Sequence, residues 1–233
     1  MSTLIKVFIA LVISIFLISC DFNFSNGTQG NGNVVTQQRE ANQTFESIKA
    51  SEGLDVFVTQ EDQTSIRIEA DENVIDLIET NVSNGKLTIE CKNPIGRATS
   101  KKIYVSLPEI RSLESSSGAD LSTMGTIRAD KISLDASSGS DIKAELQSNE
   151  VSLNTSSGAE IEVYGVTNTL NAHASSGSDI NAHRLKSKTV DAHASSGADI
   201  DVNAADEIAI HKSSGGDVSY KGSPKVVSKV KTN

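Results

Sequence analysis

The chain has 233 residues and carries 30 acidic against 21 basic side chains, a formal net charge of −9. Only 4% of its residues are aromatic, and none is tryptophan. We therefore expect no nucleic-acid partner, because binding a phosphate backbone depends on Lys and Arg, and stacked bases or sugars need aromatic platforms.

The N-terminus resembles a bacterial lipoprotein signal. Lys6 precedes the apolar run 7–18, which is too short to cross a bilayer of about 30 Å but suits a secretory signal. The run ends in Leu-Ile-Ser-Cys, a lipobox-like sequence in which cleavage before the cysteine frees it for acylation. We predict a signal peptide over residues 1–19 and a lipid on Cys20. The alternatives are an uncleaved anchor and an ordinary signal followed by a chance cysteine.

A lipid on Cys20 implies a bacterial cell-envelope protein whose partner is the membrane itself. We expect the outer membrane, on its periplasmic or surface-exposed side. Asp21 would favour the inner membrane under enterobacterial sorting rules, which do not hold in all bacteria. Residues 20–44 are rich in Asn, Gly, Gln and Thr and contain few large apolar side chains, so they predict a flexible tether.

Residues 45–110 predict irregular β coils that precede a more regular region. Apolar residues alternate along four segments, as expected of half-buried strands. These are Leu54/Val56/Val58, Ile66/Ile68/Ala70, Leu87/Ile89 and Ile103/Val105/Leu107. Asn84-Gly85 predicts a hairpin turn, and residues 71–79 predict one short capped helix. Cys91 continues one alternation and has no intramolecular partner once Cys20 is acylated, so we predict a small buried residue.

Residues 111–222 contain a six-fold repeat built on Ser-Ser-Gly-x-Asp/Glu. Its glycines are separated by 21, 19, 19, 20 and 18 residues, and a near-fixed period marks a repeat architecture. The glycines, which we expect to supply the positive φ of a tight corner, are Gly118, Gly139, Gly158, Gly177, Gly197 and Gly215.

Apolar columns flank each glycine, three positions after it and five and seven positions before it. Their period of two predicts strands on both sides of the corner, and neither a leucine-rich pattern nor a helical period is present. The repeats therefore predict parallel β coils stacked about 4.8 Å apart, so that each column becomes a ladder. Arg111 interrupts one column, and a one-residue slip would replace it with Ile110. The basic tail 223–233 contains Val226, Val227 and Val230, which we expect to cover the last coil.

The order of motifs along residues 45–220 resembles that of the auto-transporter adhesin head-domain family, the GIN domain. The matching segments are Phe45-x-x-Ile48, Gly53-Leu-Asp-Val56, Asp71-Glu-Asn-Val-Ile75, Asn84-Gly-Lys-Leu-Thr-Ile89 and the Ser-Gly-x-Asp repeats, over roughly residues 45–220. The resemblance implies an all-β, right-handed parallel β-helix in an exported, often lipid-anchored bacterial protein. It supplies no catalytic residues.

Two polar columns are candidates for metal binding. The acidic ladder, two positions after each glycine, comprises Asp120, Asp141, Glu160, Asp179, Asp199 and Asp217. It could bind calcium, but one acid per coil favours a solvated ladder because calcium takes at least six oxygens. Four positions before each glycine stand Glu114, Asp135, Asn154, His173, His193 and His211. The three histidines are weak candidates for a transition metal, and an exposed polar column is the favoured interpretation.

Catalysis is not expected. Ser, His and Asp recur together as His173, Ser175 and Asp179 and as His193, Ser195 and Asp199, but a triad needs one positioned set with an oxyanion hole. We predict a non-enzymatic envelope lipoprotein, a scaffold for adhesion or binding, with no cofactor and an unidentified protein or glycan ligand. The rival hypotheses are a polysaccharide-acting β-helix enzyme and a structural subunit of an envelope complex or homo-oligomer.

Overall fold

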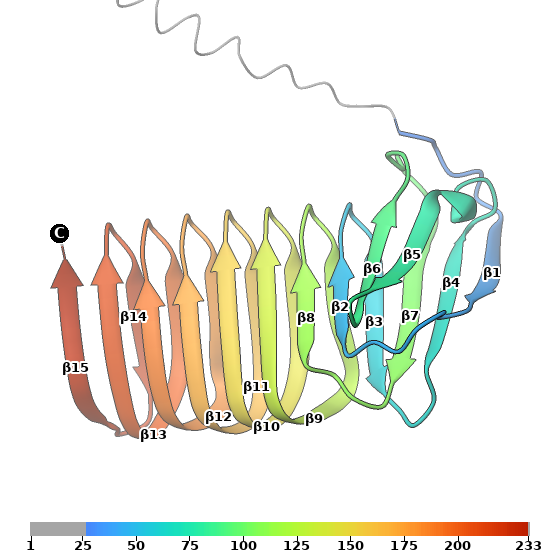
Figure 1. Cartoon of the computed structure of the whole chain (residues 1–233). Helices are drawn as coiled ribbons and strands as arrows, with labels where there is room; N and C mark the ends of the chain where they lie inside the picture. Colours follow the sequence, from blue (N-terminus) through green and yellow to red (C-terminus); the bar gives the residue numbers. More distant parts are fainter. Residues whose placement is uncertain (1–26, 233) are drawn as a thin grey trace, which may run out of the picture.

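The computed structural model describes residues 27–232, so the predicted signal peptide and Cys20 lie outside the described residues. Its strands join into one sheet that winds into a β-solenoid, which confirms the predicted fold class (Figure 1). No helix in the described part of the chain is long and apolar enough to cross a membrane.

The first half of the described chain contains short strands. They are β1 (Val34–Arg39), β2 (Ser47–Ala50), β3 (Asp55–Gln60), β4 (Ser65–Asp71), β5 (Ile78–Ser83), β6 (Lys86–Cys91), β7 (Lys101–Leu107) and β8 (Ser112–Ser115), with one 3-10 turn, η1 (Ile75–Leu77), before β5. The second half contains the long strands β9 (Asp120–Ser137), β10 (Asp141–Ser156), β11 (Glu160–Ala174), β12 (Asp179–Ala194) and β13 (Asp199–Ser213), followed by β14 (Asp217–Lys221) and β15 (Lys225–Thr232).

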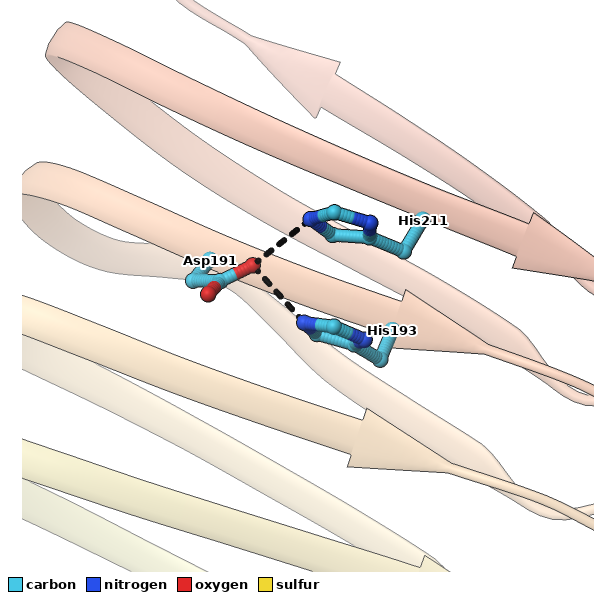
Figure 2. Close-up of side chains that lie close together, drawn as sticks. All are labelled: Asp191, His193 and His211. Atoms are coloured by element: carbon cyan, nitrogen blue, oxygen red, sulfur yellow. Dashed lines mark ion pairs between the residues drawn. The ribbon is translucent and has the colours of Figure 1, made fainter. Parts of the chain in front are cut away.

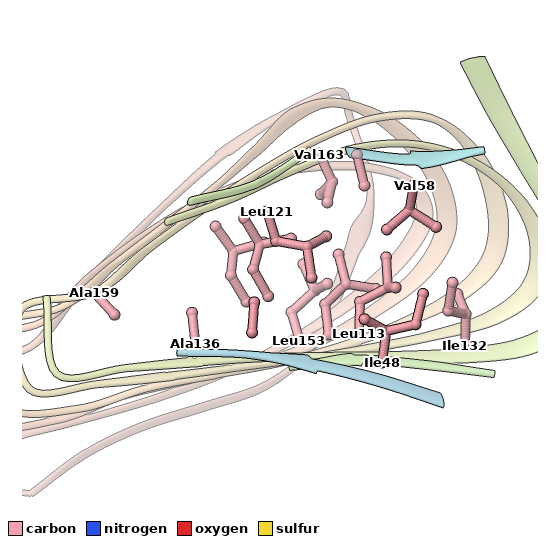
Figure 3. Packing of buried hydrophobic residues seen from close by; sticks show 14 of the residues in the cluster. Ile48, Val58, Leu113, Leu121, Ile132, Ala136, Leu153, Ala159 and Val163 are labelled. Atoms are coloured by element: carbon pink, nitrogen blue, oxygen red, sulfur yellow. The ribbon is translucent and has the colours of Figure 1, made fainter. Parts of the chain in front are cut away.

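Each long strand forms most of one coil. It leaves a Ser-Ser-Gly corner, follows one face, bends and returns along the other face to the next corner (Figure 3). Neighbouring coils pair in parallel, with Ile142 opposite Ile161 and Leu153 opposite Ala172. We call the face formed just after each glycine, which carries the acidic ladder, the acidic face. The face formed just before each glycine, which carries His173, His193 and His211, is the histidine face.

The core lies between the two faces and consists of the predicted apolar columns. The column after the glycines is buried from Leu121 to Val218, and the two columns before them are buried as well. Arg111 is exposed and Ile110 is buried in its place, which confirms the one-residue slip. Burying each Val, Leu or Ile side chain stabilises the fold by roughly 1.5–3 kcal/mol, so the columns hold the coils together.

The corners contain two consecutive residues with positive φ. The predicted positive φ is confirmed at all six glycines, from 64° to 81°, and the serine before each glycine also has a positive φ, from 46° to 58°. The N–H of each glycine from Gly118 to Gly197 donates to the serine carbonyl of the next corner, as from Gly118 to Ser138 at 3.2 Å. A serine tolerates this conformation because the corner is open and its side chain is small.

The tether prediction for residues 20–44 is wrong over its second part. Residues 34–39 form β1, which pairs antiparallel with β4 across six residue pairs. Backbone hydrogen bonds to an open sheet edge compensate for the low apolar content that suggested disorder, and Val35 packs partly against the core. The structured part of the chain therefore begins earlier than the composition predicted.

The short helix predicted over residues 71–79 is also wrong. Only Ile75–Leu77 make a 3-10 turn, and Asp71 ends β4. Asp71, the first residue of the predicted helix, is fully buried, and its carboxylate accepts hydrogen bonds from the N–H groups of Gly32 at 2.8 Å and of Thr99 and Ser100 at 3.0 Å. The carboxylate therefore joins three segments of the chain and is not free to cap a helix.

The other predictions for this half are confirmed. The four alternating segments lie in β3, with Leu54 just before it, and in β4, β6 and β7, and Asn84 and Gly85 form the turn between β5 and β6 with positive φ. The tail also forms structure, because β15 pairs in parallel with β13 as a final half-coil. Val226 and Val227 do not cover that coil with buried side chains, since they are 42% and 49% exposed.

A matched pair of glycine substitutions tests the close packing of coils. Both glycines have a positive φ, 120° at Gly165 and 66° at Gly139, but a Cβ at Gly165 would lie 2.0 Å from the Leu146 carbonyl oxygen, whereas a Cβ at Gly139 would meet nothing within 4 Å. Gly139→Ala should lower stability by about 1–2 kcal/mol through its positive φ alone, or about 2–8 °C in Tm. Gly165→Ala should lower Tm considerably more in thermal melts followed by circular dichroism. Equal losses would contradict close backbone contact at Gly165.

The buried Asp71 carboxylate should make stability fall in acid. Burial raises its pKa, but the three backbone N–H donors outweigh burial and hold the pKa below its ordinary value. A lowered folded-state pKa contributes stability above the unfolded value, and this contribution is lost as pH falls through the folded pKa. The Tm of wild type should therefore exceed that of Asp71→Asn by a constant difference from pH 7 to about 5. This difference in Tm should shrink below about pH 4. A margin that does not change with pH would contradict this role.

Candidate functional site

A groove of about 720 Å³ runs along the histidine face. It extends from Lys49 on β2 to His211 on β13, and it is lined by three consecutive residues of each coil from Glu114 onwards. Its floor and sides are small or polar side chains, because Ser, Ala and Thr occupy the positions next to each corner, including Ser137, Ser156 and Ser175. The groove therefore crosses the coils at right angles to the strands.

The residues along the groove change in character from one end to the other. Backbone register places Lys49 opposite Glu114, then Asp135, Asn154 and the three histidines on successive coils. Lys86 donates to Glu114 at 2.6 Å, and Asp135 accepts hydrogen bonds from Ser133 at 2.7 Å and Asn154 at 2.8 Å. The groove thus carries both acidic and basic side chains towards its N-terminal end and is rich in imidazole towards its C-terminal end.

The three predicted histidines form a stack. The ring centroids of His173 and His193 are 4.6 Å apart, and those of His193 and His211 are 4.1 Å apart, with nearly parallel planes. Burial and the neighbouring His193 and His211 lower the pKa of His173, although Asp191 opposes them. The stack therefore favours neutral imidazole at His173.

Sequence reasoning missed Asp191, which lies two residues before His193 on β12. Its Oδ1 is 3.0 Å from Nε2 of His193 and 3.6 Å from Nε2 of His211 (Figure 2). The side chains two residues apart on a strand share a face, so the spacing Asp-x-His could have indicated it. The column containing Asp191 holds Ser and Asn in earlier coils, and this variability concealed the acid.

The acidic ladder lies on the other face and is longer than predicted. Its six residues face one another on successive coils, and Asp55 on β3 extends the ladder beyond Asp120. Burial raises the pKa of Asp120, as do the charges of Asp141 and Asp55. Burial likewise raises the pKa of Glu160, together with the charges of its ladder neighbours Asp141 and Asp179. These carboxylates repel one another.

The described residues contain one group of His, Cys, Asp or Glu side chains with three ligand atoms close enough for a single ion. It is Asp191, His193 and His211, whose ligand atoms all lie within 4.8 Å of one another. The acidic ladder forms no such group, and whether it is a solvated ladder, as predicted, or binds calcium stays untested. His173 is not a member of the group, so the structure combines two predicted histidines with a carboxylate that was not predicted.

The serine, histidine and aspartate residues that recur in the sequence do not form a triad around His193. His193 pairs with Asp191 on its own face, while Asp199 begins β13 on the acidic face beyond the corner. Cys91 is buried, as predicted. Burial, and to a smaller extent the nearby charge of Glu52, raises the pKa of its thiol to about 11. A thiol with so high a pKa is a poor nucleophile. Neither constellation supplies a catalytic nucleophile.

A parallel β-solenoid with polar ladders on two faces and a groove across its coils defines a repeat protein suited to presenting a binding surface. A comparison with protein families identifies one family for most of the chain. Residues 44–224 match the family described as "Putative auto-transporter adhesin, head GIN domain", and the chain belongs to this family. The family resemblance found in the sequence is therefore confirmed.

Solved structures share the fold. A "putative adhesin" from Bacteroides fragilis NCTC 9343 superposes with a TM-score of 0.79 at 19% identity, covering 88% of this chain and 95% of the other. Two proteins from Parabacteroides distasonis ATCC 8503 are also similar. One, a "putative adhesin", has a TM-score of 0.71 at 15% identity, covering 88% and 97%. The other, a "putative lipid binding protein", has a TM-score of 0.66 at 19% identity, covering 86% and 94%. No curated protein matches the sequence.

Removing one charge from the acidic ladder should stabilise the protein. Unit charges about 4.8 Å apart repel by roughly 1 kcal/mol in water, and Asp141 raises the pKa of both Asp120 and Glu160. A raised carboxyl pKa contributes stability at low pH that is lost as pH rises through the folded pKa. Asp141→Asn should therefore raise Tm at pH 7 by about 2–4 °C.

The control for this charge effect is Asp201→Asn. Asp201 is an exposed acid on the same face but in the next outward column, opposite Asn181 and Ser219 rather than another acid. In calorimetric scans at the same pH, the Tm of Asp201→Asn should stay close to that of wild type. A lower Tm for Asp141→Asn would show that the ladder carboxylate has a favourable partner, and would sink the interpretation of a solvated, repulsive ladder.

Proposed function

We propose that this protein is a non-enzymatic, lipid-anchored scaffold of the bacterial envelope that binds an extended polar ligand along the groove of the histidine face. The observation that carries the proposal is the continuity of the groove, which crosses the coils from Lys49 to His211. Membership of an adhesin family supports a binding role.

The repeat gives the groove a regular pattern of hydrogen-bonding groups. Parallel coils place equivalent side chains about 4.8 Å apart, and Ser137, Ser156 and Ser175 recur along one edge of the groove. A linear polymer with repeating polar groups, such as a glycan or an extended peptide, can follow such a line. Because the groove lining contains no Phe, Tyr or Trp, recognition would depend on hydrogen bonds and charge.

The carboxylates of the groove support binding more than hydrolysis. Glycoside hydrolysis needs one protonated carboxyl group beside an ionised one. Glu114 forms an ion pair with Lys86, and Asp135 accepts two hydrogen bonds, so the oxygens of both carboxylates already have partners within the protein. This arrangement favours a scaffold over the rival polysaccharide-acting enzyme.

The lipid anchor is a proposal from the sequence Leu-Ile-Ser-Cys20. The described chain begins at residue 27 at the N-terminal end of the solenoid (Figure 1). Six residues lie between Cys20 and Gly27, and the seven residue steps from one to the other span at most about 25 Å when extended. An acylated Cys20 would therefore hold this end of the solenoid close to the membrane, with the histidines at the distal end of the groove.

A matched pair of tyrosine substitutions tests the proposed binding surface. Ser156→Tyr puts a ring into the groove, whereas Ser122→Tyr puts the same ring on the acidic face. On arrays of glycans and extended peptides, wild type and Ser122→Tyr should bind the same ligands, and Ser156→Tyr should lose at least about tenfold in affinity. The array ligands should be recovered intact after prolonged incubation.

Three outcomes would contradict the proposal. Cleavage of any array polymer would identify an enzyme, and equal effects of the two tyrosines would place binding outside the groove. Failure of wild type to bind any ligand would favour a structural subunit, which size-exclusion chromatography with light scattering can detect.

Protease treatment of intact cells, with Cys20→Ser as the unanchored control, tests whether the scaffold is at the cell surface.

A further inference from the structure

The cluster at the distal end of the groove joins two neighbouring coils. Asp191 and His193 lie two residues apart on β12, and His211 is opposite His193 on β13. The residue opposite Asp191 on β13 is Ala209, whose methyl group leaves the carboxylate room to lean towards His211. All three side chains point outward from the same face (Figure 2).

The distances fit the ligands of one small cation. Two ligand atoms about 2.0–2.1 Å from a tetrahedral ion are about 3.3 Å apart. The distances from Asp191 Oδ1 to the two imidazole nitrogens, 3.0 and 3.6 Å, lie on either side of that value. The rings of His193 and His211 are stacked with an interplanar angle of 11°, so they would have to tilt towards each other for both nitrogen lone pairs to face one ion, while Oδ1 needs only a small movement.

The buried oxygen of Asp191 lacks a hydrogen bond. Its Oδ1 is almost inaccessible to solvent and accepts no hydrogen bond, although it lies at ion-pair distance from both rings. A buried carboxylate oxygen in this state is unfavourable unless a cation or donor satisfies it. The unsatisfied atom is the one that faces both histidine nitrogens, where a bound cation would lie.

We propose that Asp191, His193 and His211 bind one divalent transition-metal ion of the zinc type. Two imidazole nitrogens and a carboxylate oxygen are ligands that Zn²⁺ accepts, whereas Ca²⁺ and Mg²⁺ require mostly oxygen. Three protein ligands leave a fourth position open to the groove for water or a donor group of a ligand. The proposal does not depend on the binding function above, because the metal can be measured without any other ligand.

His173 provides an internal control. It continues the imidazole stack, with its ring 4.6 Å from that of His193, but it does not belong to the three-ligand group. A histidine stack that binds metal would use His173, His193 and His211, as the sequence alone suggested. The proposed site uses Asp191 in place of His173, so the two variants Asp191→Asn and His173→Ala distinguish the alternatives.

The test is isothermal titration of Zn²⁺ into the tag-free full chain in detergent. Wild type should bind one ion per chain, and His173→Ala should bind it with unchanged affinity. Asp191→Asn and His211→Ala should each lose about tenfold or more, since even the loss of an outer partner of a metal ligand costs about 10–100-fold. Zn²⁺ should also raise the Tm of wild type and His173→Ala, and not that of Asp191→Asn.

Each of the other outcomes overturns the proposal. Absence of Zn²⁺ binding to wild type would show that the cluster is an ion-pair network only. An equal loss in His173→Ala would assign the metal to the histidine stack, and binding that survives all three substitutions would place it elsewhere. Thermal melts without metal confirm that the variants fold, and titration with Ca²⁺ should give no heat that depends on Asp191.

Discussion

Successive coils of the solenoid are hydrogen-bonded in parallel register over most of their length, so each residue lies beside the equivalent residue of the next coil, about 4.8 Å away. This register determines which substitutions a position tolerates. An apolar column stacks at no electrostatic cost and builds the core. A charged column repeats its own charge at short distance, and a column of small residues makes a continuous hollow in the surface.

The two faces respond differently to this constraint. On the acidic face, like charges meet along the ladder, and salt and splaying into water relieve the repulsion. Lys143 and Arg184 both bind Glu162 in the next outward column, which places positive charge beside the ladder. On the histidine face, the stacked column changes residue type between coils, from acids through Asn154 to imidazoles. Partners of different chemistry therefore meet along the groove, and this permits hydrogen bonds and ion pairs between coils.

Sequence periodicity was sufficient for the repeated part of the fold because each coil meets the same physical conditions. The corner glycines, the buried columns and the slip at Ile110 all follow from repeated local chemistry. Predictions failed where a segment depends on partners remote in sequence. The strand at residues 34–39 forms only because β4 offers an edge, and Asp71 does not cap a helix because Gly32, Thr99 and Ser100 reach its carboxylate.

The candidate site shows the same division between local and spatial information. The column of His173, His193 and His211 was visible in the sequence because it follows the repeat. Asp191 belongs to another column and acts across two coils, so its meeting with His211 depends on register and on the small side chain of Ala209. In a stack of near-identical coils, a specific site requires residues that depart from their columns. Asp191 is such a residue, and the cluster occurs only where its carboxylate meets two imidazoles that the repeat already holds in line.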